Sequence, residues 1–135
     1  MDIFNLFNRP RKIRLTRPIF QTRSRKLYLA NREVARILVR ERVKHFSAHY
    51  ESRHGVIHGR IAIRNQKSRW GSCSKKGNLN FNYKLVFLPP ELRDYVIVHE
   101  LCHIKEFNHG HAFWALVGET MPEWKALRKR LREVK

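Results

Sequence analysis

The sequence has few acidic residues, few cysteines and no long apolar run, and each shortage excludes a class of protein. Eleven Asp and Glu residues stand against 29 Lys and Arg, which gives a formal net charge of +18. The two cysteines, Cys73 and Cys102, are too few for a disulfide framework, so a reduced compartment fits best. No apolar run reaches the roughly 20 residues of a bilayer span, and the first residues lack the apolar centre of a secretion signal. We therefore expect a soluble, cytoplasmic protein with no membrane partner.

The excess of positive charge favours anionic partners. It is densest in the N-terminal segment RPRKIRLTRPIFQTRSRK and the C-terminal segment WKALRKRLREVK. Nucleic acid or another polyanion is a candidate partner. The ordinary alternative is that these basic residues only form solvent-exposed helix faces and tails. Basic charge indicates affinity for anions in general and does not by itself indicate a specific binding site.

A chain of 135 residues suits one domain with one core. Residues 1–25 are basic, contain two prolines and lack a helical period, so we expect a basic N-terminal arm ahead of a domain over residues 26–135. From Leu29 to about Tyr50, apolar residues recur at steps of three to five, which predicts a long amphipathic helix.

Two strands and three helices are predicted after this helix. The segment GRIAIRN alternates like a half-buried strand, QKSRWGSCSKKG reads as a loop, and NLNFNYKL alternates strictly from Asn78 to Leu85 as a second strand. Pro90 and Glu91 suit the first turn of a helix that we expect to reach about Phe107, before the turn residues NHG. Further helices are expected over about 111–119 and 123–134.

Two histidines and a glutamate on the first of these helices have the spacing of a metal site. His99 and His103 are four residues apart, so their imidazoles lie one turn above each other and can reach one ion. Glu100 is directed beside them, where its carboxylate can reach a water on the open side of the ion as a general base. Histidines spaced in this way can also serve only packing or hydrogen bonding. The register of Glu100 and a further histidine after a helix-stopping turn favour the metal site.

The third metal ligand is predicted to be His109, which follows His103 by six residues and lies among turn residues that would bring it back to the ion. His111 is the rival at the start of the next helix, and Glu119 or Glu123 is the rival from a later helix. His45, His49, His54 and His58 have no such third partner and are interpreted as parts of polar surfaces.

The segments RWGSCSKKGNLNFN and PPELRDYVIVHELCHIKEFNHGHAFW resemble the YgjP-type metallopeptidase family, a zincin-like group akin to the WLM and SprT domains. The resemblance runs from about the first long helix to Leu131. It implies an α+β, zincin-like fold with a long N-terminal helix, a small β-sheet, an HExxH active-site helix and C-terminal helices. It also implies zinc bound by His99, His103 and His109, with Glu100 as catalytic acid and base.

The expected reaction is hydrolysis of peptide bonds in a peptide or protein substrate. Zinc would activate a water and polarise the carbonyl, while Glu100 would carry the proton to the leaving amine. An extended peptide could pair with GNLNFN if that strand lies at an edge, so Asn80 and Asn82 are candidate substrate contacts. Arg69 is a third candidate, because a guanidinium beside the cleft could hold a carboxylate or phosphate. A structural ion pair is the alternative role for Arg69.

Two other functions stay open. The first is metal-dependent hydrolysis of a phosphoanhydride such as a nucleoside triphosphate, with arginines and lysines clamping the phosphates. The second is a nucleic-acid-binding module whose metal is structural. Against it, structural zinc is normally closed by four protein ligands, and Glu100 would then have no role.

Overall fold

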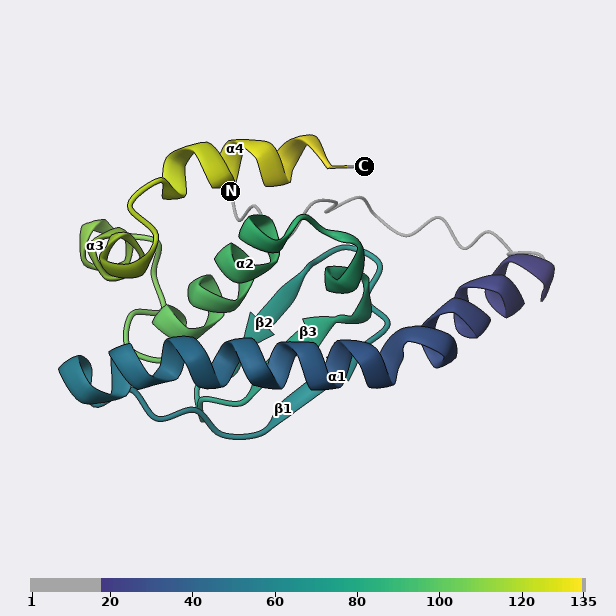
Figure 1. The fold of residues 1–135 in the computed structure, drawn as a ribbon, viewed down its shortest axis with the longest axis horizontal. Helices are drawn as coiled ribbons and strands as arrows, with labels where there is room; N and C mark the ends of the chain where they lie inside the picture. Colours follow the sequence, from purple (N-terminus) through teal and green to yellow (C-terminus); the bar gives the residue numbers. More distant parts are fainter. Residues whose placement is uncertain (1–17, 135) are drawn as a thin grey trace.

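The protein has an α+β fold in which one long helix is followed by three short strands and three further α-helices (Figure 1). The structure, a computed structural model, describes residues 18–134. Helix α1 spans Pro18–His54, and the strands are β1 (Ile61–Arg64), β2 (Gly71–Cys73) and β3 (Leu79–Asn82). A 3-10 helix, η1 (Tyr83–Phe87), leads to α2 (Pro90–His103), α3 (His111–Thr120) and α4 (Trp124–Glu133). The predicted fold class is confirmed.

Helix α1 is longer than its apolar pattern predicted. It begins at Pro18 and not near Leu29, and it continues for four residues beyond Tyr50. Part of the expected basic arm, residues 18–25, is therefore helical, and the rest of that arm, residues 1–17, lies outside the described residues.

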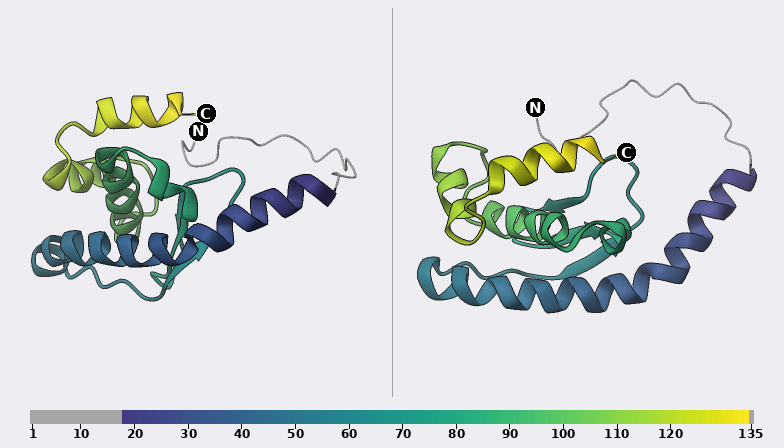
Figure 2. Two further views of the ribbon diagram at one scale, coloured as in Figure 1. Left: turned by 45° about the vertical axis from the view of Figure 1, so that its right-hand side comes forward. Right: turned by 45° about the horizontal axis from the view of Figure 1, so that its top comes forward.

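The first turns of α1 escaped the sequence pattern because they extend past the core. Leu27 and Leu29 are 46% and 45% exposed, so the apolar period that marks a packed helix is lost there. Figure 2 shows the N-terminal part of α1 projecting away from the other elements. Arginine, lysine and glutamine have good intrinsic helix propensity, and they allow the helix to continue without that packing.

The sheet has three strands in the order β1-β3-β2, with β3 in the centre. Strand β3 pairs in parallel with β1 and antiparallel with β2. The expectation that GNLNFN forms an edge strand is therefore wrong. The segment RWGSC, which was predicted to be a loop, instead contributes the edge strand β2.

Strand β3 also ends three residues before the predicted end at Leu85. The side chain of Asn82 accepts a hydrogen bond from the backbone N–H of Lys84 at 3.1 Å, and this cap starts the 3-10 helix. The side-chain amide of Asn82 donates to the carbonyls of Gln66 and Arg69 at 2.8 and 3.1 Å. Alternating burial still continues beyond the strand, which is why the sequence pattern looked like one longer strand.

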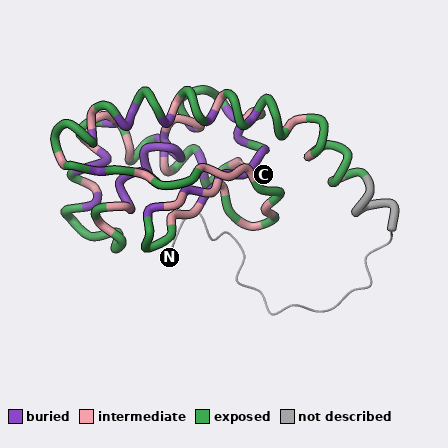
Figure 3. Tube along the Cα trace, turned by 90° about the horizontal axis from the view of Figure 1, so that it is seen from below, coloured by how far each residue is buried: buried purple, intermediate pink, exposed green. Residues whose placement is uncertain are grey.

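Helix α2 is the central element of the fold. It packs against α1, α3, α4 and β2, and Figures 1 and 2 show α1 and α4 on opposite sides of it. Ten of its 14 residues are buried. In Figure 3 the buried part of the trace gathers inside the molecule, while much of α1 faces solvent. Polar side chains on α2 are therefore largely removed from water.

Candidate metal centre

The candidate site lies where α2 ends and the chain turns back. The helix stops at His103 and not near Phe107 as predicted, because Ile104 N–H bonds to the carbonyl of Leu101 in a tighter, 3-10 type of turn. The ring of His103 closes the turn through a 3.0 Å contact between its Nδ1 and the carbonyl of Glu106. The early stop leaves the chain room to bring His109 back toward the helix.

Three imidazoles converge at this turn. The Nε2 atom of His99 lies 2.9 Å from Nε2 of His103 and 3.1 Å from Nε2 of His109. One ligand atom from each of the three histidines lies within 4.8 Å of the others. Zinc bound tetrahedrally at 2.0–2.1 Å holds its nitrogens about 3.3 Å apart, so a small outward shift would admit the ion. The spacing and the donor type fit a divalent transition metal.

The hydrogen bond of His103 to Glu106 also sets the tautomer of its ring. A carbonyl oxygen can only accept, so Nδ1 of His103 must carry the proton that is donated to Glu106. The neutral ring then has its lone pair on Nε2, the atom that faces the other two histidines. Such a bond to the second ring nitrogen is the usual way in which proteins orient metal-binding histidines.

Burial keeps this site in the form that binds metal. His99 and His103 are buried and His109 is exposed. Burial lowers the pKa of His99 well below its usual value, with further contributions from His103, His109 and Arg128. His99 is therefore neutral near pH 7, as a metal ligand must be.

Glu100 follows His99 on α2 and lies against strand β2. Its side chain is 2% exposed. A Cβ atom placed on Gly71 would lie 3.0 Å from Cγ of Glu100 and 3.1 Å from the carbonyl oxygen of Asn80, so a larger residue here would crowd the contact between β2 and the helix. The carboxylate also contributes to the raised pKa of Cys73, about 12, although burial is the larger cause. The glycine of RWGSC thus positions the edge strand next to Glu100.

An aromatic wall holds the third histidine in place. The Phe113 ring stacks on His103 with centroids 4.5 Å apart, and Trp114 stacks on His109 at 5.9 Å. Trp114 in turn stacks on Trp124 at 4.1 Å, which ties α3 to the start of α4. The exposed His109 is therefore positioned by neighbours from the next helix.

The rival third ligands lie elsewhere. Glu119 contacts His49 and His54 of α1, and His111 and Glu123 are exposed. Among the described residues, the group of three histidines is the set whose ligand atoms converge. Cys102 is fully buried next to Tyr50, and its burial raises the thiol pKa to about 12, which suits a core residue.

The three predicted substrate contacts have different surroundings. Arg69 is exposed just before β2, and no ion pair among the described residues involves it. Asn80 lies on the central strand, where its side chain accepts from Arg64 at 3.4 Å. Asn82 holds the loop before β2, as described above. Neither asparagine lies on an edge open to a peptide strand.

The comparison with protein families decides the broader identity. A model of the YgjP-like metallopeptidase domain matches residues 11–134. The chain belongs to the YgjP-like metallopeptidase family. The fold also resembles the crystal structure of the metallopeptidase zymogen abylysin from Pyrococcus abyssi, with a TM-score of 0.58 and 24% identity over 69% of this chain and 90% of that chain. No curated protein sequence matches the chain. No helix within residues 18–134 is long and apolar enough to cross a membrane.

Sequence reasoning overlooked two features of the site. Gly71 was interpreted as part of a turn, although a glycine inside a three-residue strand signals the close approach of another segment. Arg128 was included in the basic C-terminal segment and was not singled out, because nothing in the sequence distinguishes one arginine of a cationic helix from the next.

Proposed function

We propose that the protein is a zinc-dependent metallopeptidase that hydrolyses peptide bonds, with zinc held by His99, His103 and His109 and with Glu100 as the general base. The observation that carries this proposal is the convergence of three histidine Nε2 atoms, with the buried Glu100 directly following one of these histidines on α2. Three protein ligands leave one position open for catalysis, whereas structural zinc is normally closed by four.

The chemistry divides between the ion and the chain. Zinc bound at such a site supplies a water of lowered pKa and Lewis-acid polarisation of the scissile carbonyl. A carboxylate oxygen of Glu100 accepts the proton as the water attacks and returns it to the leaving nitrogen. His99, Glu100 and His103 are buried, and the lower local dielectric strengthens electrostatic interactions at these side chains.

Strand β2 is the proposed docking edge for the substrate. It has one strand neighbour, β3, and it runs next to Glu100. An extended peptide can add to such an edge through backbone hydrogen bonds, which would place a peptide bond near the carboxylate. Arg69, exposed just before β2, remains the proposed side-chain contact for an anionic group of the substrate.

Hydrolysis of a phosphoanhydride is the second candidate for the same site. It is favoured by the positive charge near the histidines, since Arg128 contributes to the electrostatic environment of His99. An arginine guanidinium can donate two parallel hydrogen bonds to a phosphate as well as to a carboxylate. The assays that test the peptidase should therefore include a nucleoside triphosphate.

The test is Glu100→Gln. The amide keeps the size of the side chain but cannot accept a proton, so zinc content should stay the same while turnover falls roughly 100- to 10,000-fold. Glu91→Gln is the matched control, because Glu91 is an exposed carboxylate on the same helix. Zinc content, peptide hydrolysis and triphosphate hydrolysis should be measured on all three proteins.

The three functions predict different results. Peptide hydrolysis that is lost only in Glu100→Gln supports the peptidase. If the wild type hydrolyses the triphosphate but no peptide, and Glu100→Gln loses the triphosphate activity, the proposed function changes from peptidase to phosphoanhydride hydrolase. Unchanged activity in Glu100→Gln would reject the role of Glu100 and favour a structural metal.

A further inference from the structure

Arg128, near the middle of α4, shares an aromatic neighbour with the candidate metal ligands. Its guanidinium carbon lies over the ring of Trp114, 5.1 Å from the centroid. The same indole stacks on His109 at 5.9 Å and lies 6.0 Å from the ring of His99. Figures 1 and 2 show why this is possible, since α4 lies across one side of α2 and contacts it. The guanidinium is thus held at the border of the three-histidine site.

The charge of Arg128 acts on that site. His99 has a lowered pKa mainly because it is buried, and the smallest of the named contributions comes from the positive charge of Arg128. A cation at this position opposes the binding of another cation by the histidines. The guanidinium is placed where it could also interact with an anion bound next to the histidines.

Among the described residues, no acidic side chain forms an ion pair with Arg128. Its Nε atom is buried without a hydrogen-bond partner among these residues. Two other arginines of the fold differ in this respect, whereas Arg93 shares a buried Nε without a partner in the described part of the chain. Arg42 makes a two-pronged bond to Asp94 at 2.9 Å, and Arg130 bonds Glu91 at 2.8 Å. A buried donor without a partner is costly, so a ligand that supplies an acceptor would bind here with a gain.

We propose that Arg128 binds an anionic group of the substrate beside the scissile bond, and that this group is the free C-terminal carboxylate of a peptide. The planar fork of a guanidinium matches a carboxylate in bidentate geometry, and stacking on Trp114 orients the fork before the substrate arrives. The inference rests on the proposed hydrolysis at the histidine site. It makes Arg128 a specificity residue that directs cleavage toward the end of a chain.

The shared chemistry is a bidentate oxyanion, which a phosphate could also supply. The first experiment measures binding without turnover, in zinc-loaded Glu100→Gln. An acetylated tripeptide with a free C-terminal carboxylate is compared by calorimetry with the same peptide as its amide. The acid should bind more tightly than the amide. Adding Arg128→Gln should weaken binding of the acid by roughly 10- to 100-fold and should change binding of the amide little.

Two further variants separate this role from charge or folding effects. Arg128→Lys keeps the charge but loses the fork, so it should retain only part of the preference for the acid. Arg130→Gln removes the same charge from another face of α4 and should keep the full preference. Zinc content is measured for each variant, because a merely structural role would change acid and amide binding together.

The outcomes separate the inference from the proposed function. Loss of the acid preference in Arg128→Gln alone supports the inference. A different result would be that inorganic phosphate binds only when Arg128 is present, while the peptide acid binds no better than its amide. The anion site would then stand, but its ligand would not be a peptide carboxylate. Equal binding of acid and amide with no Arg128-dependent phosphate binding overturns the site altogether. If the acid preference holds but the wild type cleaves neither peptide, the peptidase fails while the anion site stands.

Discussion

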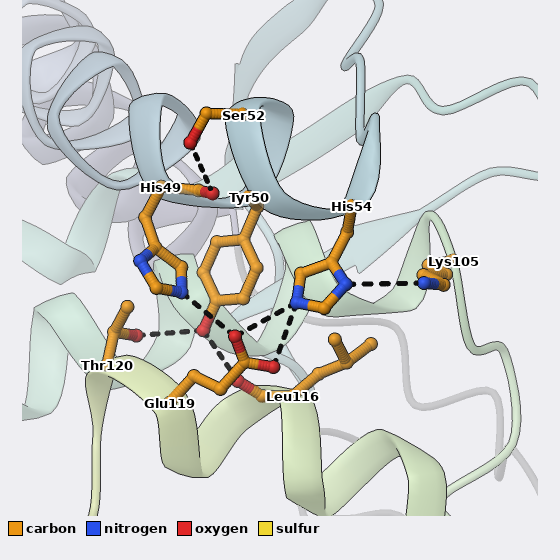
Figure 4. A network of polar contacts seen from close by, with 8 residues as sticks. All are labelled: His49, Tyr50, Ser52, His54, Lys105, Leu116, Glu119 and Thr120. Atoms are coloured by element: carbon orange, nitrogen blue, oxygen red, sulfur yellow. Dashed lines mark hydrogen bonds and ion pairs between the residues drawn. The ribbon is translucent and has the colours of Figure 1, made fainter.

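Two groups of histidines in this fold have different surroundings. His99, His103 and His109 bring their Nε2 atoms together around the end of α2. At the end of α1, His49 and His54 both contact the carboxylate of Glu119, at 3.1 and 2.9 Å (Figure 4). The first group offers lone pairs to a cation, whereas the second group already has an anion in place.

Burial accounts for the difference in chemistry. His99 and His103 of the first group lie on the buried helix α2, where burial lowers the pKa of His99, and His109 joins them from the loop that follows. His49 and His54 are more open to solvent than His99 and His103, and the hydrogen bond from His54 is the main cause of the lowered pKa of Glu119. Histidines at short spacing on a helix are therefore better candidates for a metal site where the chain brings a further imidazole to them than where a carboxylate already bonds their rings.

The strongest test of this contrast is removal of the ligands. Each of His99→Ala, His103→Ala and His109→Ala should reduce zinc affinity by more than the roughly 10- to 100-fold cost of losing a residue that only supports a ligand. The purified wild type should hold about one zinc per chain, because three converging imidazoles suffice for a catalytic site. Zinc content is measured after dialysis against a weak chelator.

His49→Ala is the matched control and should leave zinc content unchanged, since its ring bonds Glu119. Full retention of zinc in His109→Ala would contradict the assignment of the third ligand and would direct the search to His111 or a later glutamate.

The sequence predicted this site better than it predicted the elements around it. The pair His99 and His103 follows from the helical period, and the turn residues around His109 imply a return toward the helix. The end of α2 was placed about four residues too late, because a 3-10 turn depends on hydrogen bonds such as that of His103 with Glu106. Such contacts form only once the segments have packed.

Non-local pairing explains the other errors. A three-residue strand such as β2 is too short to show alternation, and its partner β3 is also paired with β1. The pattern of β3 therefore indicated a strand without saying whether it lies at an edge. Arg128 is the same kind of case, since its position beside Trp114 depends on how α4 docks against α2 and α3.

A pH titration of the zinc-free protein should sharpen the contrast. The folded-state pKa of His99 is lowered from its usual 6.5, so below this pH the unfolded chain binds a proton that the folded chain does not. Stability must then fall as pH decreases below about 6.5, by up to about 1.4 kcal/mol per pH unit for this group. Urea unfolding at pH 7.5, 6.5 and 5.5 in the presence of a chelator measures the slope.

His99→Asn should flatten this slope, because the residue that gains the proton on unfolding is gone. Glu119 should contribute little over the same range. Its pKa is lowered from 4.5, so the stability from its ion pairs is present above that value and is lost only at lower pH. Stability that does not change between pH 7.5 and 5.5 would contradict the buried, neutral state of His99.

The smallest expected effect comes from breaking the second group. Glu119→Gln removes the anion between His49 and His54, whose contacts with it are partly exposed to solvent. Ion pairs of this kind contribute about 0–1 kcal/mol, so the free energy of unfolding should fall by no more than that. The packing of α1 on α3 should survive, because the hydroxyl of Tyr50 still donates to the carbonyl of Leu116 at 2.8 Å.

The control for the loss of charge is Glu123→Gln, since Glu123 is an exposed carboxylate at the start of α4. Zinc content should not change in either variant; loss of zinc in Glu119→Gln would mean that Glu119 leaves its histidine partners to bind the ion, and the two groups would then form one connected site.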